Sequence, residues 1–127
     1  MYRLDHDAVA NIFHISAKGF WDVPTAVAFG AACVAKGGAI RLRHGHFAIL
    51  IDARNFPIQS QAVAHVTGLL LPEARLLTNG PVAFVAGAML NKLQIDRLFS
   101  GERVRSFLDR DQAVAWIDAE WTDRCAA

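Results

Sequence analysis

The sequence has little that could cross-link the chain or charge it strongly. Among 127 residues there are two cysteines, Cys33 and Cys125, and no short Cys-x-x-Cys or Cys/His spacing joins them. Neither a disulfide nor a metal site is indicated, and we expect two free thiols. Thirteen basic and twelve acidic side chains leave a formal net charge of +1. A chain so close to neutrality lacks the field that attracts nucleic acid or an acidic membrane surface.

Segments that would direct the chain into or across a membrane are also missing. The first six residues are polar and precede no apolar core, so we expect no secretory signal. No uninterrupted apolar run approaches the ~20 residues of a spanning helix, so we expect no membrane span. The default expectation is a cytoplasmic protein in a reducing compartment.

Familiar catalytic and cofactor-binding motifs are absent from the sequence. There is no Gly-x-Ser-x-Gly, no phosphate loop, no dinucleotide fingerprint and no catalytic Cys/His signature. His44 and His46 are the nearest histidine pair, but no third ligand follows at metal-binding spacing. Arg97, Arg103 and Arg105 are too few to form a phosphate-tracking surface. We therefore expect no cofactor, no metal and no nucleic-acid partner.

What the sequence does contain is enough apolar residues for one compact core. It is 54% hydrophobic and 20% charged, which suits a single domain over residues 1–127 without disulfides. Strand-like and helix-like patterns alternate after an initial hairpin, which predicts parallel pairing with right-handed crossovers. We expect strands near 2–5, 8–17, 47–51, 82–86 and 103–107, and helices near 22–36, 61–71, 88–100 and from 109 onward.

The first predicted helix has two alternative ends. Asp22 is a plausible N-cap, and Pro24 suits the first turn. Gly37 and Gly38 are a stop signal, whereas the apolar residues after them would continue the helix to about His44. We favour the longer helix, with a buried stripe formed by Val27, Ala31, Val34 and Ala35.

Two strands are predicted to lie at the centre of the sheet. Residues 47–51 (FAILI) and 82–86 (VAFVA) are continuous apolar runs, which are typical of parallel strands covered by helices on both faces. We expect the two runs to be neighbours. The first run stops at Asp52, whose carboxylate would either point into the ligand crevice of an α/β sheet or fix the turn that follows.

Four segments, taken in order, resemble the STAS/SEC14-like group, whose fold relatives include the SpoIIAA-like anti-sigma-factor antagonists. They are ILIDARNF, VAFVAGAMLNKLQIDRLF, VRSF and DRDQAVAWI, and the resemblance covers nearly the whole chain. It implies an α/β, SpoIIAA-like domain in which a small mixed β-sheet of about five strands is flanked by about four helices. It usually implies no catalysis.

The resemblance also implies one candidate phosphorylation site. In partner-switching members, a serine is phosphorylated at the start of the helix after the Asp-ended strand, within Asp-Ser-Ser/Thr-Gly. Here Ser60 occupies that corner in Gln-Ser-Gln, with no preceding acid and no following glycine. Ser60 is either a phosphorylation switch at a helix N-terminus or an ordinary N-cap.

A second candidate site lies where the central strands end. Asp52, Arg54 and Asn55 follow the first central run, and Gly87 follows the second. The side chains could contact a partner in the crevice, and the amide of Gly87 could bind an anion. Close packing between strand and helix would explain Gly87 equally well.

Three functions stay open at this point. The favoured one is a non-catalytic regulatory or binding module that acts through protein–protein contact. The alternative is a SEC14-like carrier of a small apolar ligand or lipid, and the third is an enzyme of unrecognised class. Leu69, Leu70 and Leu71 could form a homodimer face or a lipid entrance. Because Leu90, Leu93 and other bulky residues are expected to fill the core, we favour the protein contact over a cavity.

Overall fold

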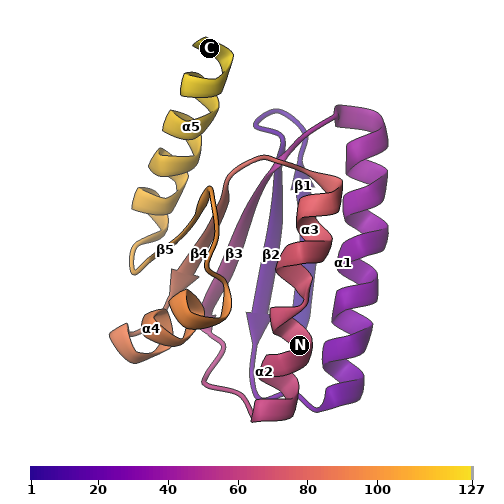
Figure 1. Cartoon of the computed structure of the whole chain (residues 1–127), viewed down its shortest axis with the longest axis vertical. Coiled ribbons are helices and arrows are strands. Elements are labelled where there is room, and N and C mark those ends of the chain that lie inside the picture. Colours follow the sequence, from indigo (N-terminus) through magenta and orange to yellow (C-terminus); the bar gives the residue numbers. More distant parts are fainter. Residues whose placement is uncertain (127) are drawn as a thin grey trace.

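A five-stranded sheet with helices on both faces forms the centre of the protein (Figure 1). The computed structural model describes the backbone of residues 1–126 and the side chains of residues 1–121, so the Cys125 thiol lies outside the described side chains. The strands lie side by side in chain order, β1-β2-β3-β4-β5. The first pair is antiparallel and the other three pairs are parallel. The predicted α/β class, a small mixed sheet flanked by helices, is confirmed.

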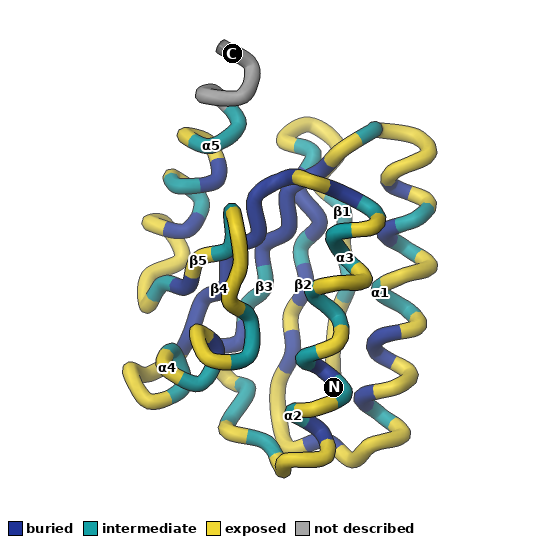
Figure 2. Tube along the Cα trace, viewed as in Figure 1, coloured by how far each residue is buried: buried dark blue, intermediate teal, exposed yellow. Residues whose placement is uncertain are grey.

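The helices form one layer on each face of the sheet. Helices α1 to α4 pack on one face, and α5 packs on the other (Figures 1 and 2). The strands are β1 (Tyr2–Asp7), β2 (Ile12–Lys18), β3 (Ala48–Asn55), β4 (Val82–Ala86) and β5 (Val104–Phe107). The helices are α1 (Val23–His44), α2 (Gln61–Gly68), α3 (Leu70–Leu77), α4 (Met89–Leu98) and α5 (Arg110–Ala126).

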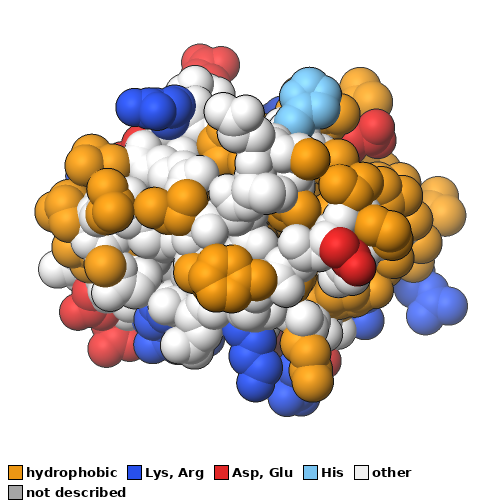
Figure 3. Space-filling view, turned by 90° about the horizontal axis from the view of Figure 1, so that it is seen from below, with side chains coloured by type: hydrophobic (Ala, Val, Ile, Leu, Met, Phe, Trp, Pro, Cys, Tyr) orange, Lys and Arg blue, Asp and Glu red, His pale blue; other side chains and the backbone are white. Residues whose placement is uncertain are grey.

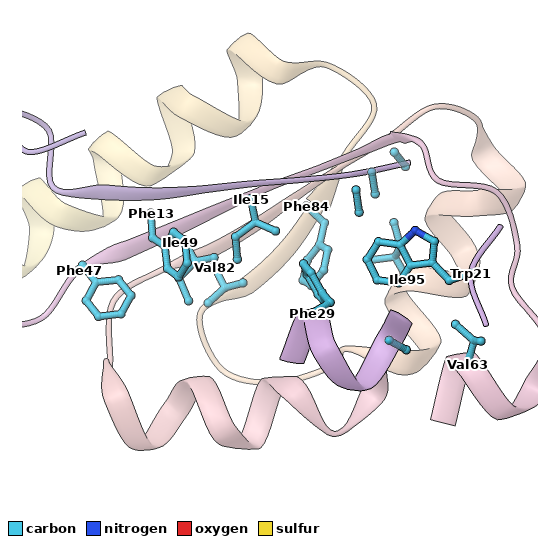
Figure 4. Close-up of a cluster of buried hydrophobic side chains, with 14 of the residues drawn as sticks. Phe13, Ile15, Trp21, Phe29, Phe47, Ile49, Val63, Val82, Phe84 and Ile95 are labelled. Carbon is cyan, nitrogen blue, oxygen red and sulfur yellow. The ribbon is translucent and has the colours of Figure 1, made fainter. Parts of the chain in front are cut away.

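Strands β3 and β4 are adjacent, parallel and covered on both faces, as their continuous apolar runs predict. Alternate side chains point to opposite faces because a strand has a period of two. Ile49 and Phe84 face α1–α4, in the cluster drawn in Figure 4. Leu50 and Val85 face α5 and pack with Ile117.

Helix α1 runs unbroken to His44, so the longer of the two expected helices is the correct one. Its N-cap is Asp22, whose carboxylate accepts a hydrogen bond from the Thr25 amide at 2.9 Å. The predicted buried stripe is wrong, because Val27 is 54% exposed and its stripe faces solvent. The stripe that packs on the core consists of Ala26, Phe29, Gly30, Cys33, Gly37 and Ile40.

Two glycines decide which face of α1 is buried. A Cβ at Gly30 would lie 2.9 Å from Cδ2 of Leu70, and one at Gly37 would lie 3.0 Å from Cδ1 of Leu77. Helix α3 therefore lies close against α1 where side chains are smallest. The periodicity of apolar residues gives weight to large side chains. It therefore predicted that the face with the valines is buried and not the face with the glycines.

By length and composition, α1 is the one helix among the described residues that could cross a membrane. The sequence analysis expected no membrane span, because α1 contains no long uninterrupted apolar run. In this structure it packs on the sheet and on α3 through the buried stripe described above.

The helix expected over residues 61–71 is two shorter helices, α2 and α3, and the described chain therefore has five helices. Pro72 lies in the first turn of α3. Proline fits there because a first-turn N–H has no partner within the helix. Leu69 joins the two helices as the C-cap of α2 and the N-cap of α3.

The N-terminal hairpin turns later than predicted. Strand β1 continues through His6 and Asp7, which were expected to form the turn. The Asp7 carboxylate instead accepts hydrogen bonds from the amides of Val9 and Ala10, at 3.0 and 3.1 Å. This side-chain turn reverses the chain immediately after β1.

Candidate functional site

An apolar cavity of about 130 Å³ lies between the sheet and helices α1–α4. Figure 4 shows side chains from the strands and from the helices pointing into the layer that contains it. The Trp21 ring meets Phe29 and Phe56 edge-on, with centroids 4.9 and 4.8 Å apart. Six of its largest wall residues are Phe13, Ile15, Trp21, Phe29, Phe84 and Phe99.

The size of the cavity restricts what it can hold. An engineered cavity of about 150 Å³ with a similar apolar lining binds benzene. A cavity of about 130 Å³ therefore suits one small ring or a short chain. Drug-sized ligands occupy pockets of roughly 300–1,000 Å³, so a whole long-chain lipid exceeds the space present.

Most polar groups in the wall of the cavity already have partners within the protein. The Gln59 side-chain amide accepts from the backbone amide of Trp21 at 2.8 Å and donates to the carbonyls of Gly19 and Pro57 at 3.0 and 2.7 Å. The Thr67 hydroxyl donates to the Val63 carbonyl at 3.0 Å. These groups hold the loop and α2 in place and are not free to bind a ligand.

Asn91 uses only part of its hydrogen-bonding capacity. It lies in the first turn of α4, and its Nδ2 donates to the Phe56 carbonyl at 2.8 Å. Its Oδ1 is buried and has no hydrogen-bond partner among the described residues.

Cys33 is a wall residue of α1 with a protonated thiol. Burial raises the pKa of this thiol to about 12, so the sulfur is neutral at physiological pH. A thiol reacts as a nucleophile only when it is ionised. Cys33 therefore contributes apolar surface to the cavity, and the expectation of a free cysteine is confirmed for it.

The predicted crevice residues lie away from this cavity. Strand β3 does not stop at Asp52 but continues to Asn55, so Asp52 and Arg54 share the sheet face opposite the cavity. Two oxygens of Asp52 accept from Nε and Nη2 of Arg54, at 3.0 and 2.7 Å. The hydrogen bond from Arg54 lowers the pKa of Asp52, although partial burial opposes this. Oδ1 of Asp52 also accepts from the backbone amide of Arg54 at 3.1 Å. The Phe56 amide donates to the Ala53 carbonyl at 3.1 Å, so the chain turns at the end of β3. These bonds agree with the expectation that the Asp52 side chain fixes the turn that follows.

Asn55 and Gly87 lie at the ends of the central strands, where Asn55 is exposed. The Asn55 carbonyl accepts from the Gly19 amide at 3.0 Å. A Cβ at Gly87 would overlap the backbone carbonyl of Arg54, so β3 and the end of β4 approach too closely for any other residue. The structure therefore supports the packing interpretation of Gly87.

Ser60 is the N-cap of α2. Its Oγ accepts a hydrogen bond from the Val63 amide at 3.3 Å, and the side chain is exposed. This is the ordinary role of a serine at a helix start. Its phosphorylation stays a hypothesis.

The predicted leucine patch is divided between the surface and the cavity. Leu69 is 56% exposed, whereas Leu70 and Leu71 are half-buried and form part of the cavity wall. Leu90 and Leu93 were expected in the core, but they are 67% and 57% exposed on α4. These two side chains therefore do not fill the core, and α4 lines the cavity with Asn91, Gln94, Ile95 and Leu98 instead.

The histidine pair has a structural setting. His44 ends α1, and Nδ1 of His46 accepts from the Asn79 amide at 3.1 Å. Among the described residues, no group of three or more His, Cys, Asp or Glu side chains is placed to hold a metal ion.

Comparison with models of known protein families and with curated proteins finds no match in either. The function of the candidate site is therefore inferred from its geometry alone. Sequence reasoning missed Asn91, although one signal was present: it is the single amide in the apolar segment AGAML-N-KL that opens α4.

Proposed function

We propose that this domain is a non-catalytic binding module that takes a small apolar ligand into the cavity between the sheet and α1–α4. The observation that carries the proposal is the cavity of about 130 Å³ with its aromatic wall. Protein interiors are close-packed and have few voids larger than a water molecule. An unfilled apolar void lowers stability in proportion to its volume, so a natural domain that keeps one gains from a ligand that fills it.

This proposal reverses the preference drawn from the sequence. Protein contact was favoured because bulky residues were expected to leave no room in the core. The outward orientation of Leu90 and Leu93 removes that reason. The SEC14-like side of the family resemblance agrees with a carrier, and the volume limits the cargo to a small molecule.

Chemistry in the cavity wall supports binding without catalysis. The Cys33 thiol is neutral because burial raises its pKa to about 12. Glu73, exposed on α3, is the one charged side chain in the wall among the described residues. A nucleophile paired with a base is thus not assembled by these side chains.

Contact with a protein partner is a second candidate function, favoured by the outer face of α1. Val27, Val34 and Leu42 are exposed along this helix. Figure 3 shows hydrophobic side chains gathered on its right, where α1 lies in Figure 1. Contiguous exposed apolar patches often mark surfaces that bind another protein.

Trp21 provides a direct test of the cavity. It is one of three tryptophans, and Trp116 and Trp121 pack on the opposite face of the sheet. Replacing those two with phenylalanine leaves Trp21 fluorescence as a reporter of the cavity. We expect a saturable change in emission when cyclohexane is added, because it enters beside the indole ring.

A cavity-filling variant makes this test specific. Cys33→Leu should remove the response to cyclohexane and keep or raise the unfolding temperature, since its extra methyl groups occupy the void. Ala31→Leu, on the exposed face of the same helix, is the matched control and should bind as the parent does. An unsaturable emission change that is the same in the parent and in Cys33→Leu would contradict the proposal.

A further inference from the structure

Strand β1 forms one edge of the sheet, and among the described residues β2 is its one strand partner (Figure 1). The pairing begins at Met1 and Lys18, which exchange two hydrogen bonds of 3.0 and 3.3 Å between their backbone groups. Opposed residues of an antiparallel pair alternate between bonded and non-bonded positions, so the amides and carbonyls of Tyr2, Leu4 and His6 point away from β2. An edge of this kind is a template for pairing with another chain.

The charges on β1 alternate in sign. Arg3 and Asp5 share one face of the strand, and their side chains are 80% and 57% exposed. A third charge, Asp7, accepts hydrogen bonds from the Val9 and Ala10 amides within the turn. Charges on an edge strand commonly prevent self-pairing, because like charges meet. With one exposed charge of each sign, β1 can pair with a copy of itself so that opposite charges meet.

One antiparallel register between two copies satisfies both the backbone and the charges. A two-fold axis at Leu4 places Leu4 opposite Leu4 of the second copy and Tyr2 opposite its His6, so the outward backbone groups bond each other. It also places Arg3 opposite Asp5 of the second copy, at a non-bonded position where side chains come closest. The next register that keeps the backbone bonds brings Arg3 opposite Arg3 in one direction and Asp5 opposite Asp5 in the other, which is unfavourable. The charge pattern therefore selects the register centred on Leu4.

We propose that β1 is a homodimer interface, at which two copies of the domain join edge to edge into one continuous sheet, with Arg3 of each copy paired to Asp5 of the other. The contact lies on this strand and not at Leu69, where the leucine patch had suggested a homodimer face. It buries little surface, so the dimer is a weak one that forms at micromolar to millimolar concentration. No residue of β1 belongs to the cavity wall, so the interface is independent of the proposed ligand binding.

Amide hydrogen exchange in the unmodified protein locates the contact. Sedimentation velocity over a concentration series should show the dimer and give the fraction present. Where the dimer forms, the Leu4 and His6 amides should exchange more slowly than in the monomer, because each gains a carbonyl partner. The Arg3 and Asp5 amides already point to β2 and should change little. A protein that stays monomeric at millimolar concentration, or a dimer without protection at Leu4 and His6, would overturn the proposal.

Charge reversal tests the register. Arg3→Glu and Asp5→Arg should each weaken the dimer by about tenfold, because each places two like-charged pairs across the interface. Arg105→Glu, on β5 at the other edge of the sheet, changes the net charge as Arg3→Glu does and should dimerise like the parent. Circular dichroism checks the fold of each variant, and if one does not fold, the exchange measurement in the unmodified protein still decides.

Mixing the two β1 variants tests whether residues 3 and 5 of different copies meet. One variant has only acidic and the other only basic side chains at these two positions, so each cross-strand pair in a mixed dimer again joins opposite charges. We expect native mass spectrometry of an equimolar mixture to show the mixed dimer in excess over either homodimer. The ion pair between Arg3 and Asp5 within one copy is broken in both variants, so restoring it does not explain the recovery. A dimer that Arg3→Glu leaves unchanged, or a mixture without the mixed dimer, would contradict the proposed interface.

Discussion

Thr78 and Phe47 exchange two hydrogen bonds just before β3. The Phe47 amide donates to Thr78 Oγ1 at 2.8 Å, and the same hydroxyl donates to the Phe47 carbonyl at 2.6 Å. Thr78 Oγ1 also accepts from the Gly80 amide at 3.1 Å. The buried Thr78 hydroxyl thus pairs both backbone polar groups of Phe47, whereas neighbouring strands pair those of the residues in β3.

Thr78→Val should be strongly destabilising. Valine has nearly the same shape, but it leaves the buried backbone groups of Phe47 unpaired, at roughly 2–4 kcal/mol in total. Urea unfolding would measure the loss. Thr67→Val is the control and should lower stability by less than about 1 kcal/mol, because the Thr67 hydroxyl only donates to helix carbonyls. Equal losses in both variants would contradict this account of Thr78.

Gly87→Ala should destabilise the domain by roughly 1–3 kcal/mol, because its Cβ would overlap backbone of Arg54 that cannot easily move. Gly38→Ala provides the opposite case. Its Cβ would meet nothing within 4 Å in the middle of α1, so alanine should stabilise the helix by about 0.5–1 kcal/mol. Thermal unfolding of the two variants should therefore shift in opposite directions.

The stabilisation from Asp52 should depend on pH. The hydrogen bond from Arg54 lowers the folded-state pKa of Asp52 below the unfolded value of about 3.9. The stabilisation is thus present above pH ~4 and is lost as the pH falls through the folded-state pKa. Asp52→Asn should be less stable than the parent by under about 1 kcal/mol at pH 7, because the pair is partly exposed. A difference of the same size at pH 2 would show that the ion pair is not its cause.

Ser60→Ala should lower the free energy of unfolding by about 1 kcal/mol, because it removes the N-cap of α2. Ser60→Asp should keep most of the stability, since aspartate caps a helix start equally well. Neither change is expected to alter ligand binding. Phosphopeptide mapping of the protein from its native cell addresses the alternative, and phosphate found on Ser60 would establish it as a modification site.

Local patterns in the sequence predicted most of the elements and the centre of the sheet. The apolar runs at residues 47–51 and 82–86 place β3 and β4, and Asp22 and Ser60 begin α1 and α2. These features depend on neighbours within a few residues, such as the amide three positions after a cap. Periodicity and capping therefore predict them without knowledge of the fold.

Which face each element turns inward was decided by tertiary packing. Helix α1 buries Gly30 and Gly37, because Leu70 and Leu77 of α3 need the space above them. Strand β3 continues past Asp52 to Asn55 because β2 and β4 pair with it. This continuation places the Asp52 side chain on one face of the sheet.

The candidate site was hidden from the sequence for the same reason. A cavity is space that side chains from several elements leave unfilled. No pattern within a single segment of the sequence can therefore predict it. Asn91 lies in the cavity wall and donates to the carbonyl of Phe56, a contact between residues 35 positions apart that no local pattern predicts. Sequence alone determined that the domain could build a packed core, whereas the three-dimensional arrangement decided where that core stays open.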